Sequence, residues 1–219
     1  MDDLFFPFSP IPRAKRRLTL ALDTAWAILQ AGGVVAYPSE TVWGLAALTD
    51  HPGAVERLYA VKGRAAHHPV QVSCQDASMA LGLAQPDASL LALSALWPGP
   101  LTLVTPAQPD VSPLLAPGGL VGLRVPGHAL ALALLRRAGG RLLTTSCNPS
   151  GQPPALTAGQ ARGMRLADHV FTGDQGYEDA TEGQASTVVV LPEGKVLRSG
   201  PLDGAVAEIL AALRAGGAA

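Results

Sequence analysis

Two cations flank a glycine at residues 62–64 of this chain, Lys62 and Arg64. Such a pair can hold a polyphosphate, because lysine acts as a point charge and the arginine fork can chelate two oxygens. The same pair can instead be two cations at a helix end, where they interact favourably with the helix dipole. Taken alone, Lys62 and Arg64 are better explained as two cations at a helix end.

A turn rich in hydrogen-bonding groups, TTSCNPSG (144–151), follows an apolar segment. Asn148–Pro149 and Ser150–Gly151 are turn signals. Ligands of α/β sheets usually bind outside the carboxyl ends of the strands, so this turn would present Ser146 and Asn148 to a ligand. A plain polar turn explains the pattern equally well.

PSETVWGL (38–45) also follows an apolar segment, VVAYP, and offers two hydroxyls and a carboxylate through Ser39, Thr41 and Glu40. These groups can line a ligand site at a strand end. A capping box, in which Ser39 or Thr41 covers the start of a helix, is the alternative. Taken alone, the segment favours the cap.

Two arginines interrupt apolar segments, Arg124 in LVGLRVP and Arg198 in KVLRSG. A guanidinium inside a buried strand needs an anionic partner. That partner can be a carboxylate of the core, but the chain has only 17 acidic residues. A bound carboxylate or phosphate is therefore a serious alternative.

Common catalytic signatures are missing from the sequence: it has no GxxxxGK[ST], GxGxxG, HExxH or GxSxG. The pair His67–His68 lacks further ligands nearby, so we expect no metal site. In WPGPLTLV (97–104), Trp97–Pro98–Gly99–Pro100 is a rigid turn that would launch a strand and fix a wall of the site. Cations and hydroxyls without a nucleophile suit the positioning of anions, with catalysis by charge stabilisation and proximity.

The predicted strands and helices alternate along the chain, and this order predicts a fold of the α/β class that would position these residues. Apolar periodicity and turn residues predict helices over 20–31, 51–63, 76–84, 88–96, 128–139, 157–165 and 203–214. They predict strands over 34–38, 70–73, 101–107, 120–126, 141–146, 186–191 and 195–200. A hairpin over the last two strands favours a mixed sheet. We expect an N-terminal arm over 1–18, one domain over 19–214 and a loose tail over 215–219.

The composition indicates a compact globular protein, because 48% of the 219 residues are hydrophobic and only 15% are charged. A formal net charge of −1 gives no global field for nucleic acid or membranes. Only two cysteines and no secretory signal predict a cytoplasmic location. The first residues are too short and too interrupted by proline to span a membrane.

In this order, the segments resemble those of the YrdC-like threonylcarbamoyl-AMP synthase family. That family has PTETVYGL, a KxR pair, WPGPLT, an RxP strand, an SxN turn followed by SG, an STV strand and a late RxG. This chain has PSETVWGL, KGR, WPGPLT, RVP, SCNPSG, STV and RSG, from about residue 32 to residue 200. Each segment is weak evidence alone, and the seven in order are strong.

The resemblance implies a single YrdC-like domain, a twisted mixed sheet with flanking helices around a positively charged central cavity. It implies an L-threonylcarbamoyladenylate synthase, a nucleotidyltransferase that uses ATP, L-threonine and bicarbonate and releases pyrophosphate. Mg²⁺ would accompany the ATP. The product would serve the threonylcarbamoyladenosine modification of tRNA, through partner proteins.

The resemblance also implies roles for individual residues. The ATP-binding residues would be Lys62, Arg64, Ser146, Asn148 and Arg198, with Lys62 and Arg64 gripping the phosphates and the leaving pyrophosphate. The threonine-binding residues would be Ser39, Arg124, Thr144 and Ser186, with Arg124 on the substrate carboxylate.

The chain departs from the family pattern at Ser39, Trp43, Ala65 and Ser73, where the family usually has threonine, tyrosine, proline and histidine. Three of these positions belong to the amino-acid side of the implied site. A paralogue with the same nucleotide site and another substrate is therefore an alternative. A non-enzymatic RNA-binding module is a second alternative, and a carbamoyltransferase module of the hydrogenase-maturation type is a third.

Overall fold

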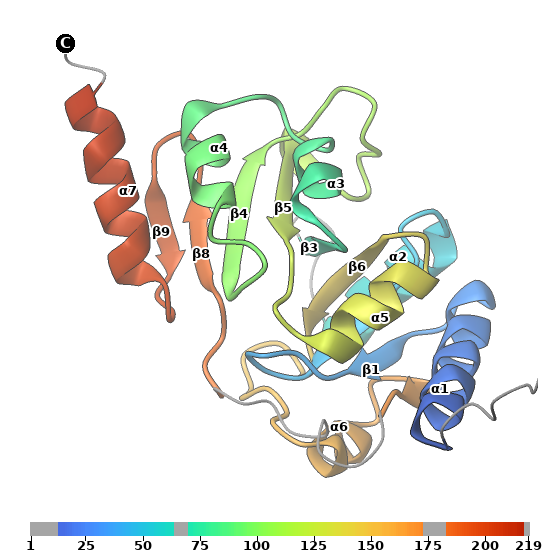
Figure 1. Cartoon of the computed structure of the whole chain (residues 1–219). Helices are drawn as coiled ribbons and strands as arrows, with labels where there is room; N and C mark the ends of the chain where they lie inside the picture. The colour runs from blue at the N-terminus through green and yellow to red at the C-terminus, as the bar shows by residue number, and fades with distance from the viewer. Residues whose placement is uncertain (1–12, 64–69, 173–182, 217–219) are drawn as a thin grey trace, which may run out of the picture.

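The structure, a computed structural model, describes residues 13–63, 70–172 and 183–216. Its described strands form one nine-stranded sheet in the order β7-β1-β2-β6-β3-β5-β4-β8-β9 (Figure 1). The strands are β1 (Val35–Tyr37), β2 (Gly44–Ala47), β3 (Gln71–Cys74), β4 (Leu101–Pro106), β5 (Leu120–Arg124), β6 (Arg141–Ser146), β7 (His169–Val170), β8 (Thr187–Val190) and β9 (Lys195–Arg198).

Both kinds of strand pairing occur in this sheet, as predicted. Three pairs are parallel, namely β1 with β7, β3 with β5 and β4 with β8. The other pairs are antiparallel, including the predicted hairpin of β8 and β9. Strand β3 therefore lies between β5 and β6, so segments distant in the sequence meet at the centre of the sheet.

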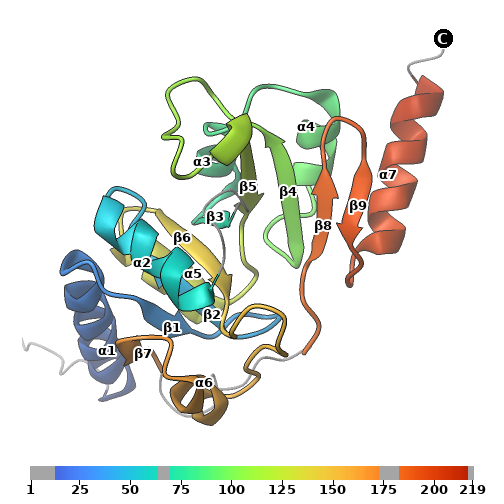
Figure 2. The same ribbon diagram turned by 180° about the vertical axis from the view of Figure 1, so that it is seen from behind.

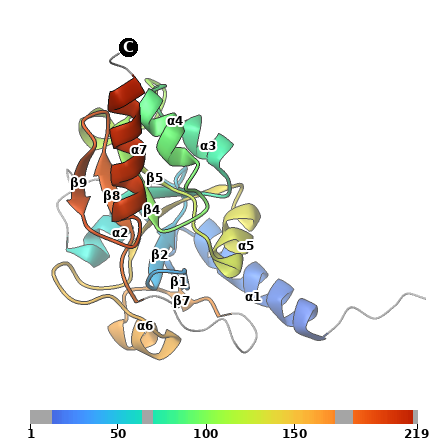
Figure 3. The ribbon, with the colours of Figure 1, turned by 60° about the vertical axis from the view of Figure 1, so that its left-hand side comes forward.

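Helices cover the two faces of the sheet unequally. They are α1 (Arg13–Gln30), α2 (Pro52–Lys62), α3 (Ala77–Leu81), α4 (Ala88–Ser94), α5 (Ala129–Arg137), α6 (Ala158–Met164) and α7 (Asp203–Gly216), with a short 3₁₀ helix at Pro117–Gly119. One apolar cluster lies under α2, α3, α4, α6 and α7, and a second lies under α1 and α5. Helices α1 and α7 lie at opposite ends of the molecule (Figure 1 and Figure 3).

Alternation along the strands divides apolar from polar side chains. In β6, Leu143 belongs to the first cluster, Leu142 to the second, and Thr144 lines a cavity. Residues two apart in a strand face the same side, so the cavity shares its face with α1 and α5. These two helices cover only one end of that face, and the central strands stay open beyond them (Figure 2).

Local signals place the helix ends as the sequence predicts. Helix α2 has Pro52 in its first turn and ends at Gly63, which adopts the left-handed conformation with φ 61°. Thr157 caps α6 by accepting a hydrogen bond from Gln160 N. The carboxylate of Asp203, the first residue of α7, accepts from Gly200 N and from the hydroxyl of Thr187. It thereby fixes the start of α7 to β8.

Some predicted boundaries are wrong. Helix α1 begins at Arg13 rather than at residue 20, so part of the expected arm is helical, and α7 continues to Gly216. Strands β2 and β7 were not predicted, because GLAA lacks β-branched residues and a two-residue strand carries no periodicity. No helix in the described ranges is long and apolar enough to cross a membrane.

Candidate active site

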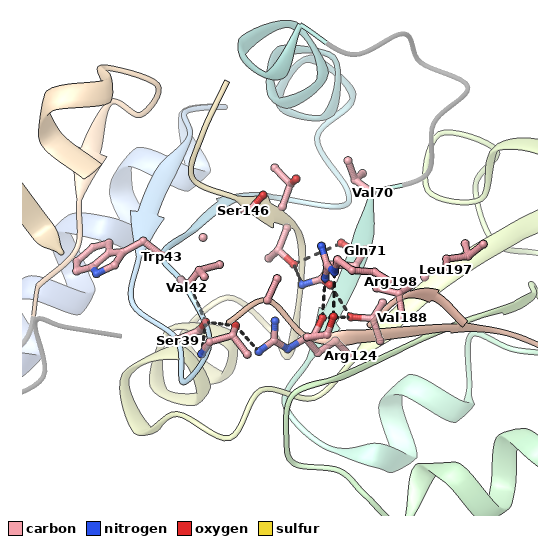
Figure 4. A pocket seen from close by; sticks show the side chains of 18 of the residues that line it. Ser39, Val42, Trp43, Val70, Gln71, Arg124, Ser146, Val188, Leu197 and Arg198 are labelled. Atoms are coloured by element: carbon pink, nitrogen blue, oxygen red, sulfur yellow. Dashed lines mark hydrogen bonds between the residues drawn. The ribbon is translucent and has the colours of Figure 1, made fainter. Parts of the chain in front are cut away.

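A cavity of about 640 Å³ opens over the central strands of the sheet. Its walls come from β1 to β6, from β8 and β9, and from the loops that follow β1 and β6. The charged side chains among its described lining residues are Arg124 and Arg198, and no carboxylate is among them. Figure 4 shows Ser39 and Arg124 along one side of this space, Gln71 and Arg198 at its middle, and Ser146 toward another edge.

Lys62 lies in the interior at the end of α2, with only 1% of its surface exposed. Its ammonium donates to the carbonyl oxygen of Ser146 at 2.8 Å, and to the carbonyl and side-chain oxygens of Asn148, both at 2.7 Å. An ammonium has three donors, and these contacts use all three. Lys62 therefore braces the 144–151 turn from behind, and it does not line the cavity.

The braced turn is further fixed by its own hydrogen bonds. Ser146 Oγ donates to Asn148 Oδ1 at 2.6 Å, and Asn148 Nδ2 donates to the carbonyl of Gln152. The backbone N–H of Cys147 donates to the carbonyl of Trp43 at 2.7 Å. This arrangement presents Ser146 and Ser150 at the cavity wall, so the turn is more than a plain polar loop.

Arg124, buried at the end of β5, has a carboxylate of this chain as its partner. Its Nη2 donates to Glu40 Oε1 at 2.7 Å and to the hydroxyl of Thr41 at 2.9 Å. Its Nε has no hydrogen-bond partner among the described residues. Of the two partners considered from the sequence, the core carboxylate is thus present, while one buried donor of the guanidinium remains available.

The segment after β1 forms a bend that leads into β2, and no helix begins there. The capping interpretation of Ser39 and Thr41 is therefore wrong. Ser39 Oγ donates to the carbonyl of Val42 at 2.6 Å and lies 2.9 Å from the hydroxyl of Thr41. These bonds connect Ser39, through Thr41, to Arg124, and all three residues line the cavity.

A second network of side chains runs across the floor of the cavity. The amide Nε2 of Gln71 donates to Thr144 Oγ1 at 3.1 Å, and Thr102 donates to Gln71 Oε1 at 2.9 Å. Thr102 lies 2.9 Å from Ser186, which accepts from Arg198 Nη2 at 2.9 Å. Four strands thus contribute polar groups to one continuous chain.

Ser73 and Tyr37 extend this network below the floor. Ser73 Oγ lies 2.6 Å from Thr144 Oγ1. Burial raises the pKa of the Tyr37 hydroxyl, although Arg124 and hydrogen bonds with Thr144 and Ser73 oppose the increase. Gly44 lies opposite Tyr37, and a side chain there would come within 2.7 Å of the Tyr37 ring. Tyr37 is therefore a neutral hydroxyl in a fixed position.

Most residues predicted for the site meet at this cavity. The lining includes Ser39, Arg124, Thr144, Ser146, Ser186 and Arg198, with Lys62 and Asn148 behind the turn. Arg64 and Ala65 lie outside the described residues, as do His67 and His68. Sequence reasoning did not single out Gln71 or Thr102. The signal for Gln71 was the alternation in VQVS, which places Gln71 and Ser73 on one face of a strand.

Two departures from the family pattern have different surroundings. Trp43 is among the residues that line the cavity, but its indole packs in the apolar core and points away from the space (Figure 4). Ser73 lies on the cavity face, buried beneath the floor, where its hydroxyl supports Thr144. Only the second departure therefore acts on the polar network.

A family model described as "Telomere recombination", which covers the Sua5, YciO and YrdC proteins, matches residues 27–200. The chain belongs to the Sua5–YciO–YrdC family. This match confirms the resemblance seen in the seven segments, and it includes every residue predicted for the site.

Members of the Sua5–YciO–YrdC family with curated names are similar to this chain. The threonylcarbamoyl-AMP synthase of Stenotrophomonas maltophilia is 37% identical over 164 residues, which cover 72% of this chain and 88% of that protein. The Bacillus subtilis protein of the same name is 40% identical over 138 residues, or 61% of this chain. The chain spans less than half of that longer relative, since the match covers 40% of it.

Solved structures of the family share the fold. Sua5 of P. abyssi, crystallised with L-threonine, superposes with a TM-score of 0.76 and is 29% identical, covering 86% of this chain and 57% of that one. YciO of E. coli has a TM-score of 0.74 at 23% identity, which shows a common fold. The predicted α/β domain with a twisted mixed sheet and flanking helices is confirmed.

Proposed function

We propose that this protein is an L-threonylcarbamoyladenylate synthase. It forms threonylcarbamoyl-AMP and pyrophosphate from ATP, L-threonine and bicarbonate, for the threonylcarbamoyladenosine modification of tRNA. One observation carries this proposal: predicted site residues as far apart as Ser39 and Arg198 line one cavity. The curated names of the Stenotrophomonas and Bacillus relatives, and the L-threonine bound to P. abyssi Sua5, support the same reaction.

The amino-acid half of the site lies around Arg124. Its Nε is a buried donor without a partner among the described residues, which suits the carboxylate of threonine. Glu40, which accepts from Nη2 of the same guanidinium, balances its charge and orients it. Ser39, Thr144 and Ser186 complete this half, and their hydroxyls are already oriented by hydrogen bonds.

The nucleotide half lies around the 144–151 turn. We infer that Ser146, Asn148 and Arg198 hold ATP together with Arg64. Lys62 acts through the turn that it braces, since its three donors are engaged by Ser146 and Asn148. Its charge still lies next to the wall and favours an anion there.

The reaction needs positioning and neutralisation of charge more than covalent catalysis. Threonine and bicarbonate give a carbamate with loss of water, and an oxygen of the carbamate attacks the α-phosphorus of ATP while the bond to the bridging oxygen of pyrophosphate breaks. Fixed cations stabilise the negative charge that develops on the phosphoryl oxygens. Mg²⁺ would accompany ATP and neutralise part of the charge of its phosphates.

The reaction also implies partners and a location. Threonylcarbamoyl-AMP is an activated intermediate, so partner proteins must transfer its carbamoyl group to tRNA. We infer a cytoplasmic location, where ATP and tRNA occur together. Direct RNA binding would be weak, given the net charge of −1.

Amino-acid-dependent release of pyrophosphate tests this function. The protein is incubated with Mg–ATP, bicarbonate and one amino acid, and the adenylate is identified by mass spectrometry. We expect release with threonine to exceed release with serine or alanine. Equal release with all three would favour a paralogue with another substrate, whereas no turnover together with RNA binding would favour the RNA-binding alternative.

A further inference from the structure

Gln71 connects the two halves of the cavity floor. It lies opposite Thr144 of β6 and opposite Gly122 of β5. Because Gly122 has no side chain, the amide of Gln71 can extend across β5 and reach Thr102 on β4. Gln71 therefore contacts both flanks of the floor, and its contacts extend through Thr102 to Ser186 and Arg198.

The amide oxygen of Gln71 fixes the direction of these hydrogen bonds. An amide oxygen accepts and cannot donate, so Thr102 must spend its only proton on Gln71 Oε1. The contact of 2.9 Å between Thr102 and Ser186 must then be donated by Ser186. Ser186 accepts in turn from Arg198 Nη2. All of these bonds point from Arg198 toward Gln71.

This direction decides what the wall offers to a ligand. Thr102 and Ser186 have each used their single proton within the protein, so only lone pairs remain for a ligand. Both residues line the cavity. A matching ligand must therefore bring a hydrogen-bond donor to this wall, because neither oxygen has a proton left to donate to an acceptor.

We propose that Gln71 is a positioning and specificity-determining residue, which makes Thr102 and Ser186 acceptors for an N–H or O–H donor of the amino-acid substrate. This inference rests on the proposed function and adds that one wall of the cavity accepts hydrogen bonds from the substrate. In threonine the donor is either the amino group or the side-chain hydroxyl. Gln71 itself acts through its neighbours.

Two substitutions at Gln71 separate polarity from packing. In Gln71→Met a side chain of similar length lacks the acceptor. The Thr102 hydroxyl can then donate to another group, and the direction of the hydrogen bonds along the wall is no longer fixed. In Gln71→Glu the acceptor toward Thr102 is kept. With threonine-dependent pyrophosphate release as the assay, we expect KM for threonine to rise about tenfold in Gln71→Met. KM for ATP should not change in Gln71→Met, whereas Gln71→Glu adds a carboxylate to a cavity that binds anions, so both KM values should rise in that variant.

Valine and serine identify the donor. Valine has a methyl in place of the hydroxyl, and serine keeps the hydroxyl. If the inhibition constant of valine rises in Gln71→Met as much as KM for threonine, the donor is the amino group. If valine is unaffected while threonine and serine both weaken, the donor is the hydroxyl. Either result supports the role of Gln71.

A double-mutant cycle with Thr102→Val completes the test. Thr102→Val is nearly isosteric and breaks the same chain, so we expect it to reproduce Gln71→Met, and the double variant to be no weaker than either single one. Effects on KM that multiply, or an unchanged KM in Gln71→Met with a wild-type melting temperature, would overturn the inference. Because the wild-type enzyme is assayed in parallel, failure of the proposed function itself appears separately, as absent threonine-dependent turnover.

Discussion

The ammonium of Lys62 and the side-chain oxygen of Asn148 lie 2.7 Å apart in the interior, although 86 positions separate them in the sequence. The same ammonium reaches two carbonyl oxygens of the turn that contains Asn148. A cation at the end of α2 thus holds the loop that follows β6. This relationship makes the turn rigid, and it suggests that an intact Lys62 is a condition for nucleotide binding.

Replacing Lys62 tests this dependence. In Lys62→Met three acceptors lose their donor in the interior, and we expect the free energy of unfolding to fall by about 3 kcal/mol. KM for ATP should rise at least about tenfold, because the turn loses its support, while KM for threonine should change little. Lys195→Met removes an exposed lysine of β9 and is the matched control. Chemical denaturation and initial-rate kinetics measure both effects, and equal changes in the two KM values would contradict a divided cavity.

Replacing Arg124 should weaken threonine binding and leave ATP binding nearly unchanged. In Arg124→Ala the carboxylate of Glu40 stays buried without its guanidinium, and a cost in stability of about 3–5 kcal/mol is expected. KM for threonine should rise strongly and KM for ATP should remain close to that of the wild type. Adding Glu40→Gln to Arg124→Ala should restore part of the melting temperature without restoring threonine binding. Recovery of both would indicate that Arg124 is only structural.

Thr105 offers a stabilising substitution. Its hydroxyl is fully buried in β4 and has no hydrogen-bond partner among the described residues. Thr105→Val keeps the shape and removes an unsatisfied polar atom, so a gain of about 1 kcal/mol is expected. For a chain of this size the melting temperature should rise by about 2–4 °C. Activity should be unchanged, and a lower melting temperature would show that the hydroxyl has a partner in solution.

The cysteines should be inert in the folded protein. Burial raises the pKa of Cys74 to about 12 and that of Cys147 to about 11. At pH 8 the thiolate fraction of Cys147 is on the order of one in a thousand. Iodoacetamide should therefore label neither residue under native conditions and both in denaturant, as counted by mass spectrometry. Rapid native labelling of Cys147 would show that the turn opens.

The free energy of unfolding should decrease at acidic pH because of His128. Burial lowers its pKa from 6.5, although Glu40 opposes the shift. The unfolded chain then binds the proton more tightly, so the stabilising contribution is present above pH 6.5 and is lost as the pH falls below it. Burial and Arg162 lower the pKa of His169 in the same direction. The melting temperature of the wild type should fall between about pH 7.5 and pH 5. The fall should be smaller in His128→Asn, and an equal fall would assign the effect to other groups.

Local patterns in the sequence were sufficient for much of the fold. Apolar runs located seven of the nine strands in the described residues, and Gly63 and Thr157 lie at a helix end and a helix start that the predicted ranges contain. The order of polar segments after strands gave most of the cavity lining. These features depend on near neighbours in the chain, so a single sequence contains them.

The sequence by itself determined the α/β class, the family and the types of residue at the site. Only the tertiary structure determined which residues contact one another. Because β3 lies between β5 and β6, Gln71 meets residues 31 and 73 positions away, and Arg124 meets Glu40 across 84 positions. The charge of a side chain follows from its residue type. Its partners depend on strand order and register, which the whole core sets, and those partners make Lys62 a brace and Gln71 the centre of the cavity floor.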